Sequence, residues 1–211
     1  MKTMIMIDGE FLRSKCRSSL RQRLSADIVR EFIIGVHRRL GLSETDPHRT
    51  YFYDCRPADK KDAVLPVSKK LFDFTASPMF KERNHQLDEI NAIDFLSLRL
   101  GQVSFKGWTL RNDKGSSSAV LSDDDYKPDF QQKGVDMKIG LDIAWASYNK
   151  MAENIVLVTG DSDFVPAIKV ARRNGLFAYI LTLSHGVKPD LTANADILIT
   201  DGIREFFTTT D

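Results

Sequence analysis

Short apolar runs alternate with amphipathic segments along this chain. The apolar runs have the length and the content of β-branched and aromatic residues expected of strands, and they cover residues 3–7, 50–54, 102–110, 155–158, 176–181 and 197–200. Apolar residues at helical spacing follow in 26–40, 87–100 and 136–148. Strands that alternate with helices predict an α/β fold, with a mostly parallel sheet covered by helices on both faces. A length of 211 residues fits a single domain over 1–211.

Two segments of the chain carry further expectations. Residues 111–134 turn polar, with serines after Gly115 and three aspartates from Asp123, and they predict a mobile loop whose acidic run is solvated. The helix that follows has five apolar residues at helical spacing. They predict a stripe that faces the core: Met137, Leu141, Ala144, Trp145 and Tyr148.

The stretch 155–166 combines a buried strand, an acidic loop and the start of a helix. Gly160 allows a tight turn after the strand, Asp161 and Asp163 follow, and Pro166 suits the first turn of a helix. In open α/β sheets, ligands bind at the carboxyl ends of the strands, where this loop lies. Two carboxylates at that place favour a divalent cation between them. The alternative is structural: Asp163 caps the helix and Asp161 closes a turn.

Other segments bring acids to the same edge of the predicted sheet. Asp8 follows the first strand and precedes Gly9, and Asp136 lies in the first turn of a later helix. Carboxylates that converge without paired histidines or cysteines favour Mg²⁺ or Mn²⁺ over zinc. Asp142 lies about 240° around the helix from Asp136, so the two side chains do not easily share one ligand.

Three sequence blocks in this order resemble the NYN domain, a family of PIN-like nucleases. They are Ile7-Asp8-Gly9, the run from Lys133 to Asp136, and the run from Val158 to Phe164 with its proline-led helix; the resemblance extends over residues 3–201. It implies a Rossmann-like sheet and a metal-dependent ribonuclease. It further implies that four aspartates catalyse the reaction and hold the metal: Asp8, Asp136, Asp161 and Asp163.

The same resemblance marks one supporting acid and one departure. Asp142 matches a position where the family often carries an acid, and we expect it to support the four aspartates from behind. Family members usually have asparagine three residues after the first aspartate, but this chain has Phe11, which offers neither a carbonyl nor an amide. Glu10 is the neighbouring group that we expect to compensate.

Charge along the chain indicates where RNA binds. The formal net charge is only +1, so a nucleic-acid footprint has to be local. Residues 13–23 carry cations without any acid, immediately after Asp8, although such a run is also compatible with a solvated face. The predicted backbone-binding residues are Arg13, Lys15, Arg17, Arg21, Arg23, Lys133 and Lys138. A near-neutral chain favours single-stranded or looped RNA over a duplex.

Alternatives to the nuclease remain at this stage. A non-catalytic RNA-binding or regulatory module of the same fold is favoured by Phe11. A haloacid-dehalogenase-like phosphatase needs a second aspartate two residues after Asp8, where Glu10 stands instead. The apolar runs are too short to span a membrane, and Cys16 and Cys55 have no metal-binding spacing, so we expect a cytoplasmic protein with reduced thiols. Phe206 and Phe207 near the C-terminus leave a homo-oligomer open.

Overall fold

The computed structural model, which describes residues 2–42, 48–111 and 121–207, contains a seven-stranded sheet with the strand order β6-β5-β2-β1-β7-β8-β9. Neighbouring strands are parallel throughout, except for the antiparallel pair β5–β6. The bounds are β1 Thr3–Asp8, β2 His48–Cys55, β5 Leu96–Leu110, β6 Tyr126–Lys133, β7 Asn154–Val158, β8 Phe177–Leu181 and β9 Ile197–Ile199. The predicted α/β fold with a mostly parallel sheet is confirmed.

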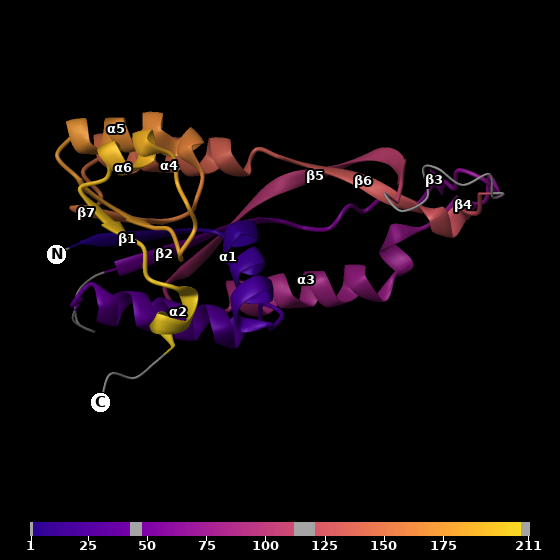
Figure 1. The fold of residues 1–211 in the computed structure, drawn as a ribbon, viewed down its shortest axis with the longest axis horizontal. Helices are drawn as coiled ribbons and strands as arrows, with labels where there is room; N and C mark the ends of the chain where they lie inside the picture. The colour runs from indigo at the N-terminus through magenta and orange to yellow at the C-terminus, as the bar shows by residue number, and fades with distance from the viewer. Residues whose placement is uncertain (1, 43–47, 112–120, 208–211) are drawn as a thin grey trace.

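Helices cover both faces of this sheet, as the sequence predicts (Figure 1). The helices on one face are α1 (Gly9–Lys15), α2 (Ala26–Arg39) and α3 (Pro78–Asn91); those on the other are α4 (Val135–Tyr148), α5 (Val165–Arg173) and α6 (Pro189–Asn194). Short 3-10 turns span Phe74–Ala76, Asp123–Asp125, Ser162–Phe164 and Ile203–Phe206, and a π-helical turn spans Cys16–Leu20. None of the helices in the described residues is both long and apolar enough to cross a membrane.

The central strand β1 has one apolar row for each face. Ile5 and Ile7 pack towards α2, whereas Met4 and Met6 pack towards α4 and α5. The chain leaves β1 through α1 on one face, and it enters the neighbouring strand β7 from α4 on the other face. The connections thus change face beside β1, and in α/β folds ligands bind at the carboxyl ends of the strands at such a point, here those of β1 and β7.

Strand β5 continues well beyond the sheet. Its first six residues pair with β2, while Gln102 to Leu110 pair with β6 in the described residues. We call residues 102–110 and 126–133 the arm, which projects from the body in Figure 1. The small hairpin of β3 (Ala63–Val64) and β4 (Leu71–Phe72) is tied to the arm, because Trp108 Nε1 donates to Val64 O at 2.9 Å.

Aromatic side chains hold the arm against the segment that leads into α3. Phe74 lies at their centre, with ring centroids 5.1 Å from Phe130, 5.2 Å from Phe105 and 5.7 Å from Trp108. Aromatic pairs at such distances stabilise a fold beyond the area that they bury. This cluster therefore gives the arm a small core of its own.

Two sequence predictions about elements are wrong. The helix expected over 87–100 is α3, which ends at Asn91, and β5 begins at Leu96 after Phe95 turns the chain with φ +59°. Leu87, Ile90 and Ile93 keep helical spacing up to the bend, which hid the boundary. The loop expected over 111–134 contains β6, a strand with mostly exposed residues; residues 112–120 lie outside the described residues.

The stripe expected to face the core from α4 is exposed. Met137 keeps 71% and Trp145 keeps 56% of its surface, while Ile139 and Ile143 are fully buried. Both sides of α4 are apolar, so spacing alone could not choose between them. The core-facing residues are Val135, Ile139, Ile143 and Ala146.

Candidate active site

Asp8 is the last residue of β1 and caps α1. Its Oδ1 accepts hydrogen bonds from the backbone N of Glu10 and of Phe11, both at 3.1 Å. Burial raises the pKa of Asp8 to about 6, and the negative charges of Asp136 and Asp54 act in the same direction against these two hydrogen bonds. The strand and the cap therefore hold a carboxylate in a largely buried position that disfavours its charged form.

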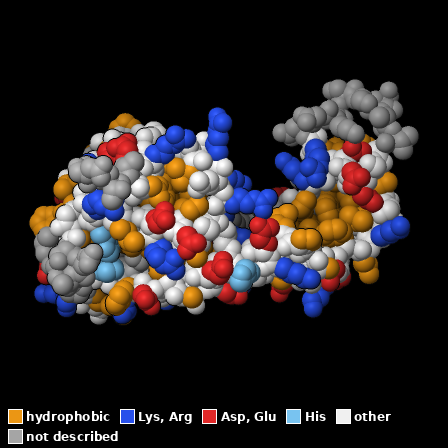
Figure 2. Space-filling view, turned by 90° about the horizontal axis from the view of Figure 1, so that it is seen from below, with side chains coloured by type: hydrophobic (Ala, Val, Ile, Leu, Met, Phe, Trp, Pro, Cys, Tyr) orange, Lys and Arg blue, Asp and Glu red, His pale blue; other side chains and the backbone are white. Residues whose placement is uncertain are grey.

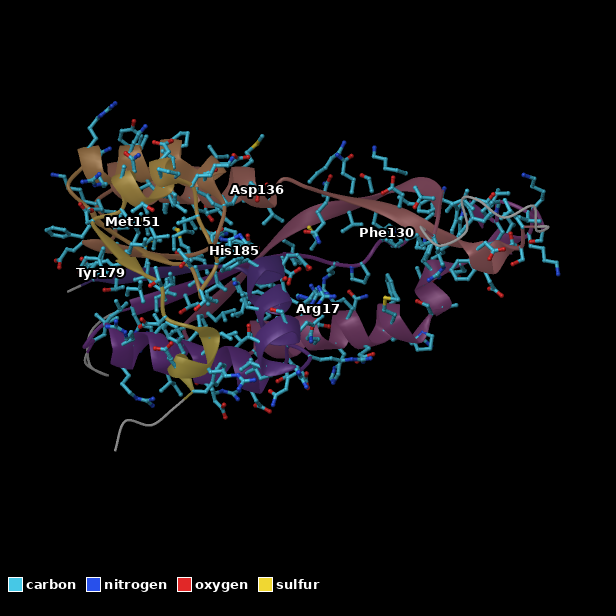
Figure 3. The ribbon with its side chains drawn as sticks, viewed as in Figure 1. Arg17, Phe130, Asp136, Met151, Tyr179 and His185 are labelled. Atoms are coloured by element: carbon cyan, nitrogen blue, oxygen red, sulfur yellow. The ribbon has the colours of Figure 1, made fainter. Side chains whose placement is uncertain are left out.

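Asp136 lies in the first turn of α4, after Gly134 has turned the chain with φ +81°. Partial burial raises its pKa, and the charges of Asp161 and Asp163 raise it further. Figure 3 shows Asp136 at the start of α4, where this helix meets the end of the arm. The helix that follows the arm thus brings a carboxylate to the edge formed by β1 and β7.

Asp161 and Asp163 belong to the loop that follows β7. Asp161 N donates to Thr159 Oγ1 at 3.1 Å, and Asp161 Oδ1 accepts from Asp163 N at 2.9 Å. Asp161 thus caps the 3-10 turn before α5, which reverses the roles in the structural alternative, where Asp163 was the cap. The cap uses Oδ1, and both aspartates remain exposed to solvent.

These four aspartates are linked by charge from one to the next. The negative charge of Asp136 raises the pKa of Asp8, and the charges of Asp161 and Asp163 raise the pKa of Asp136. However, within residues 2–42, 48–111 and 121–207, no three His, Cys, Asp or Glu side chains form a group that could hold a metal ion. The four oxygen-donor side chains fit a hard divalent cation by chemistry and by charge, but they are not arranged as a formed ligand shell.

Sequence reasoning missed Asp54, which lies near the end of β2 with its side chain fully buried. Its carboxylate accepts from Arg13 Nη2 and from Arg83 Nη2, each at 2.6 Å, and also from Cys55 N at 2.7 Å. Asp54 thereby ties α1 and α3 to the sheet. It closes an apolar strand as Asp8 does, so the same sequence rule could have found it.

Gly9 permits this close approach between β2 and α1. A Cβ at this position would lie 2.6 Å from Tyr53 O and 2.7 Å from Asp54 Oδ2. Any larger residue would push α1 away from β2 and with it the cap at Asp8. The glycine after the first aspartate is therefore required for packing.

Phe11 fills space beside the acids together with His185. Their rings meet edge to face with centroids 5.7 Å apart, and a Cβ on Gly160 would lie 2.3 Å from His185 Cδ2 and 2.9 Å from Phe11 Cε2. Figure 3 shows His185 in the connection after β8. The expected asparagine position thus holds an aromatic contact between α1 and the loops after β7 and β8.

The two acids expected to support the site make other contacts. Asp142 Oδ2 accepts from the Tyr53 hydroxyl at 2.9 Å and lies 3.4 Å from Arg99 Nε. Burial and then Asp142 raise the pKa of Tyr53. Glu10 Oε1 accepts from Arg17 Nη2 at 3.0 Å, and its other oxygen lies 3.8 Å from Arg13 Nε. Asp142 therefore orients Tyr53, and Glu10 faces the basic residues.

The basic run after Asp8 divides into buried and exposed members. Arg13 is largely buried on Asp54, and its Nη1 is buried without a hydrogen-bond partner among the described residues. Lys15 lies over the Phe11 ring, 5.5 Å from the centroid. Arg23 pairs with Glu82 at 2.8 Å, and Arg17, Arg21, Lys133 and Lys138 are exposed. The run is therefore not one solvated face.

Comparison with known proteins confirms the resemblance to the NYN domain for the second half of the chain. The family model of the NYN domain matches residues 102–202. An uncharacterized protein, MJ0482 from Methanocaldococcus jannaschii, is 27% identical over 124 residues, which are 58% of this chain and 50% of that protein. The matched stretch thus spans about half the length of this relative.

One solved structure has a similar fold over nearly the whole chain. It is a protein of unknown function, VPA0982 from Vibrio parahaemolyticus, with a TM-score of 0.51 and 16% sequence identity. The superposition covers 94% of this chain and 91% of that one. At this identity the likeness concerns the fold alone.

Proposed function

Since this chain carries an NYN domain of the PIN-like nuclease family in residues 102–202, we propose that it is a divalent-metal-dependent ribonuclease. The observation that carries the proposal is the chain of charge between Asp8, Asp136, Asp161 and Asp163 at the carboxyl edge of the sheet, where burial and charge raise the pKa of Asp8 to about 6. Side chains that repel one another in this way favour the binding of a cation.

The residues that would hold Mg²⁺ or Mn²⁺ are these four aspartates. Such a cation, when bound, lowers the pKa of a water and neutralises charge on the phosphate. Asp8 keeps its orientation because the N–H groups of Glu10 and Phe11 fix one of its oxygens. Asp161 is similarly fixed through Asp163 N. We infer that Asp136, on a separate helix, closes the set from the other side.

The proposed substrate is single-stranded or looped RNA. Arg17 and the exposed Arg21 and Lys138 would bind its phosphates, in the manner of contacts that position a strand without reading its sequence. The chain has nearly equal numbers of cations and acids, which disfavours the long basic surface that a duplex needs.

A second candidate function is a non-catalytic RNA-binding module of the same fold. Two observations favour it: Phe11 stands where the family usually has asparagine, and no three acids form a group that could hold a metal in the described residues. This alternative predicts RNA binding that is independent of metal and unaccompanied by cleavage.

The test is a cleavage assay on a pool of single-stranded and hairpin RNAs, with Mn²⁺ or with EDTA. We expect the wild type to cleave RNA with Mn²⁺ but not with EDTA. Asp161→Asn should not cleave RNA under either condition, but it should still bind the RNA because its phosphate contacts remain. Mn²⁺ should also raise the melting temperature of the wild type, since a ligand of the folded state stabilises that state. Binding without cleavage by the wild type favours the second candidate.

A further inference from the structure

A groove lies between the arm and the helices α3 and α1. Its volume is about 530 Å³, within the range of small-molecule sites. Its walls include Glu10 and Arg17 from α1, Phe80 and Arg83 from α3, and Phe130 from the arm. We call this space the arm groove. Glu10 lies two residues after Asp8 and is the groove-lining residue nearest to it in the sequence.

The arm groove continues along α3. A second cavity of about 420 Å³ shares Arg13, Arg17, Met79 and Arg83 with it and extends to Arg23 and Gln86. Two adjoining hollows with a common basic wall form a path that is longer than one small molecule requires. A polymer with regularly spaced charges fits such a path better than a compact metabolite.

Arginines supply the charge of this groove. Arg13, Arg17, Arg56 and Arg83 all line it, while the carboxylates that pair with them are Asp54, Glu10 and Asp88. One buried carboxylate, Asp54, thus serves two arginines, which leaves positive charge uncompensated. Arg17 and Arg56 keep 60% and 43% of their side-chain surface, and their ion pairs lie at the surface. Such pairs are weak, so a phosphate can replace the carboxylate.

Aromatic and apolar side chains from α3 and from the arm line the same groove. Phe130 keeps 41% of its surface and Met79 keeps 76%, and Phe80 is half-buried between α3 and the groove. Phe74 packs against Phe130 at 5.1 Å and holds its ring in place. Figure 2 shows hydrophobic side chains gathered on the projecting end of the molecule, with both basic and acidic side chains at the borders of the patch. An exposed apolar patch with a charged rim is typical of a binding surface.

Together these walls match one ligand chemistry. Guanidinium groups bind phosphates, and a supported aromatic ring stacks on a nucleobase, so the combination fits a nucleic-acid strand whose base faces are open. A duplex hides those faces. An acidic peptide would satisfy the arginines but would leave the rings of Phe80 and Phe130 without a flat partner.

We propose that the arm groove binds single-stranded RNA, with phosphates on Arg17 and Arg56 and an unpaired base on Phe130. The strand then runs along α3 and passes Glu10 to reach the acids at the end of β1. This inference rests on the proposed ribonuclease function and adds the path of the substrate and the reason for its single-stranded character.

The test measures the binding of a fluorescent single-stranded RNA of about 12 nucleotides, in EDTA, to the full chain. Arg17→Gln, Arg56→Gln and Phe130→Leu should each weaken binding by about fivefold or more, because each removes a phosphate contact or a stacked base. The arginine variants should also flatten the dependence of affinity on salt. Matched controls are Arg173→Gln and Phe177→Leu, which are exposed residues outside the groove. Melting temperatures near that of the wild type verify that each variant is folded.

The outcomes separate the groove from the nuclease. Unchanged affinity in all three groove variants would mean that RNA does not bind in the arm groove, which overturns the proposal and favours a protein as the ligand of this groove. Equal losses for single-stranded RNA and for a duplex of the same length also overturn it. If the groove variants lose affinity but the wild type cuts no RNA with Mn²⁺, the groove stands and the ribonuclease function fails.

Discussion

At the scale of single residues, Asp8 shows most clearly how the fold prepares its acidic edge. Its pKa is raised from 3.8 to about 6, chiefly by burial. A raised carboxyl pKa means that the folded state holds a proton more tightly than the unfolded state. The stability that the protonated Asp8 contributes to the fold is fully present below pH 3.8 and is lost as the pH rises through about 6. In the metal-free protein, the negative charge of the Asp8 carboxylate therefore destabilises the fold at neutral pH.

Asp8→Asn should stabilise the metal-free protein at pH 7.5. Asparagine keeps the cap of α1 but carries no charge, so the gain in the free energy of unfolding should approach about 3 kcal/mol. Urea unfolding in EDTA measures it, and the advantage over wild type should shrink as the pH falls to 4.5. If Asp8→Asn is less stable than the wild type at pH 7.5, the carboxylate of Asp8 stabilises the fold and its role is structural.

The comparison has to be between variant and wild type, because His37 titrates with the opposite sign. Burial and then the neighbouring His48 lower the pKa of His37 to about 4 from 6.5. Its stabilisation is present above pH 6.5 and is lost as the pH falls through about 4. In the pH dependence of wild-type stability, the contributions of Asp8 and His37 oppose each other over the same pH range. The difference in stability between Asp8→Asn and the wild type removes the His37 contribution and isolates that of Asp8.

Asp54→Asn should be among the most damaging single changes in the described residues. It removes the charge that pairs with Arg13 and Arg83 while both guanidinium groups stay largely buried. Loss of one partner from a buried ion pair costs about 3–5 kcal/mol. Asp88→Asn is the matched control, since Asp88 pairs with Arg56 at the surface and should change stability by less than about 0.5 kcal/mol. Similar losses for both variants would contradict the role given to Asp54.

At the scale of elements, sequence patterns predict the strands that are buried on both faces. The strands β1 and β7 could be predicted with their acids, because an apolar run that ends beside a glycine and an aspartate marks both the strand and its end. The strand β6 could not, because the arm exposes most of its residues and leaves no apolar alternation. The arm groove could not be predicted either, since it depends on how far β5 extends beyond β2.

In helix α4, the spacing of apolar residues predicted the wrong buried face. Substitutions on its two faces can test which of them packs against the sheet. Ile143→Ala should lower the free energy of unfolding by about 2–5 kcal/mol, because Ile143 is fully buried against the sheet. Leu141→Ala, two residues away and 61% exposed, should change it by less than about 1 kcal/mol. A large loss for Leu141→Ala in urea unfolding would mean that the exposed side of α4 is covered in solution.

At the scale of the whole molecule, three separate segments bring acids to one edge of one sheet. The order β2-β1-β7 places the ends of these strands side by side, and α4, which begins directly after the arm, adds Asp136. The family resemblance predicts which residues meet, while the absence of a formed ligand shell in the described residues comes only from the structure. The fold therefore sets the position of the acids, and the cation between them remains part of the proposed function.

The most direct test of this account is single-turnover cleavage of a single-stranded RNA by the wild type and by Asp136→Asn, over a series of Mn²⁺ concentrations. Asp190→Asn, an exposed aspartate of α6, is the control. We expect that wild type and control cut the RNA only with Mn²⁺, and that Asp136→Asn is slower by roughly 100-fold or more while still binding the RNA. Cleavage by Asp136→Asn at the wild-type rate, or wild-type cleavage that persists in EDTA, would contradict it.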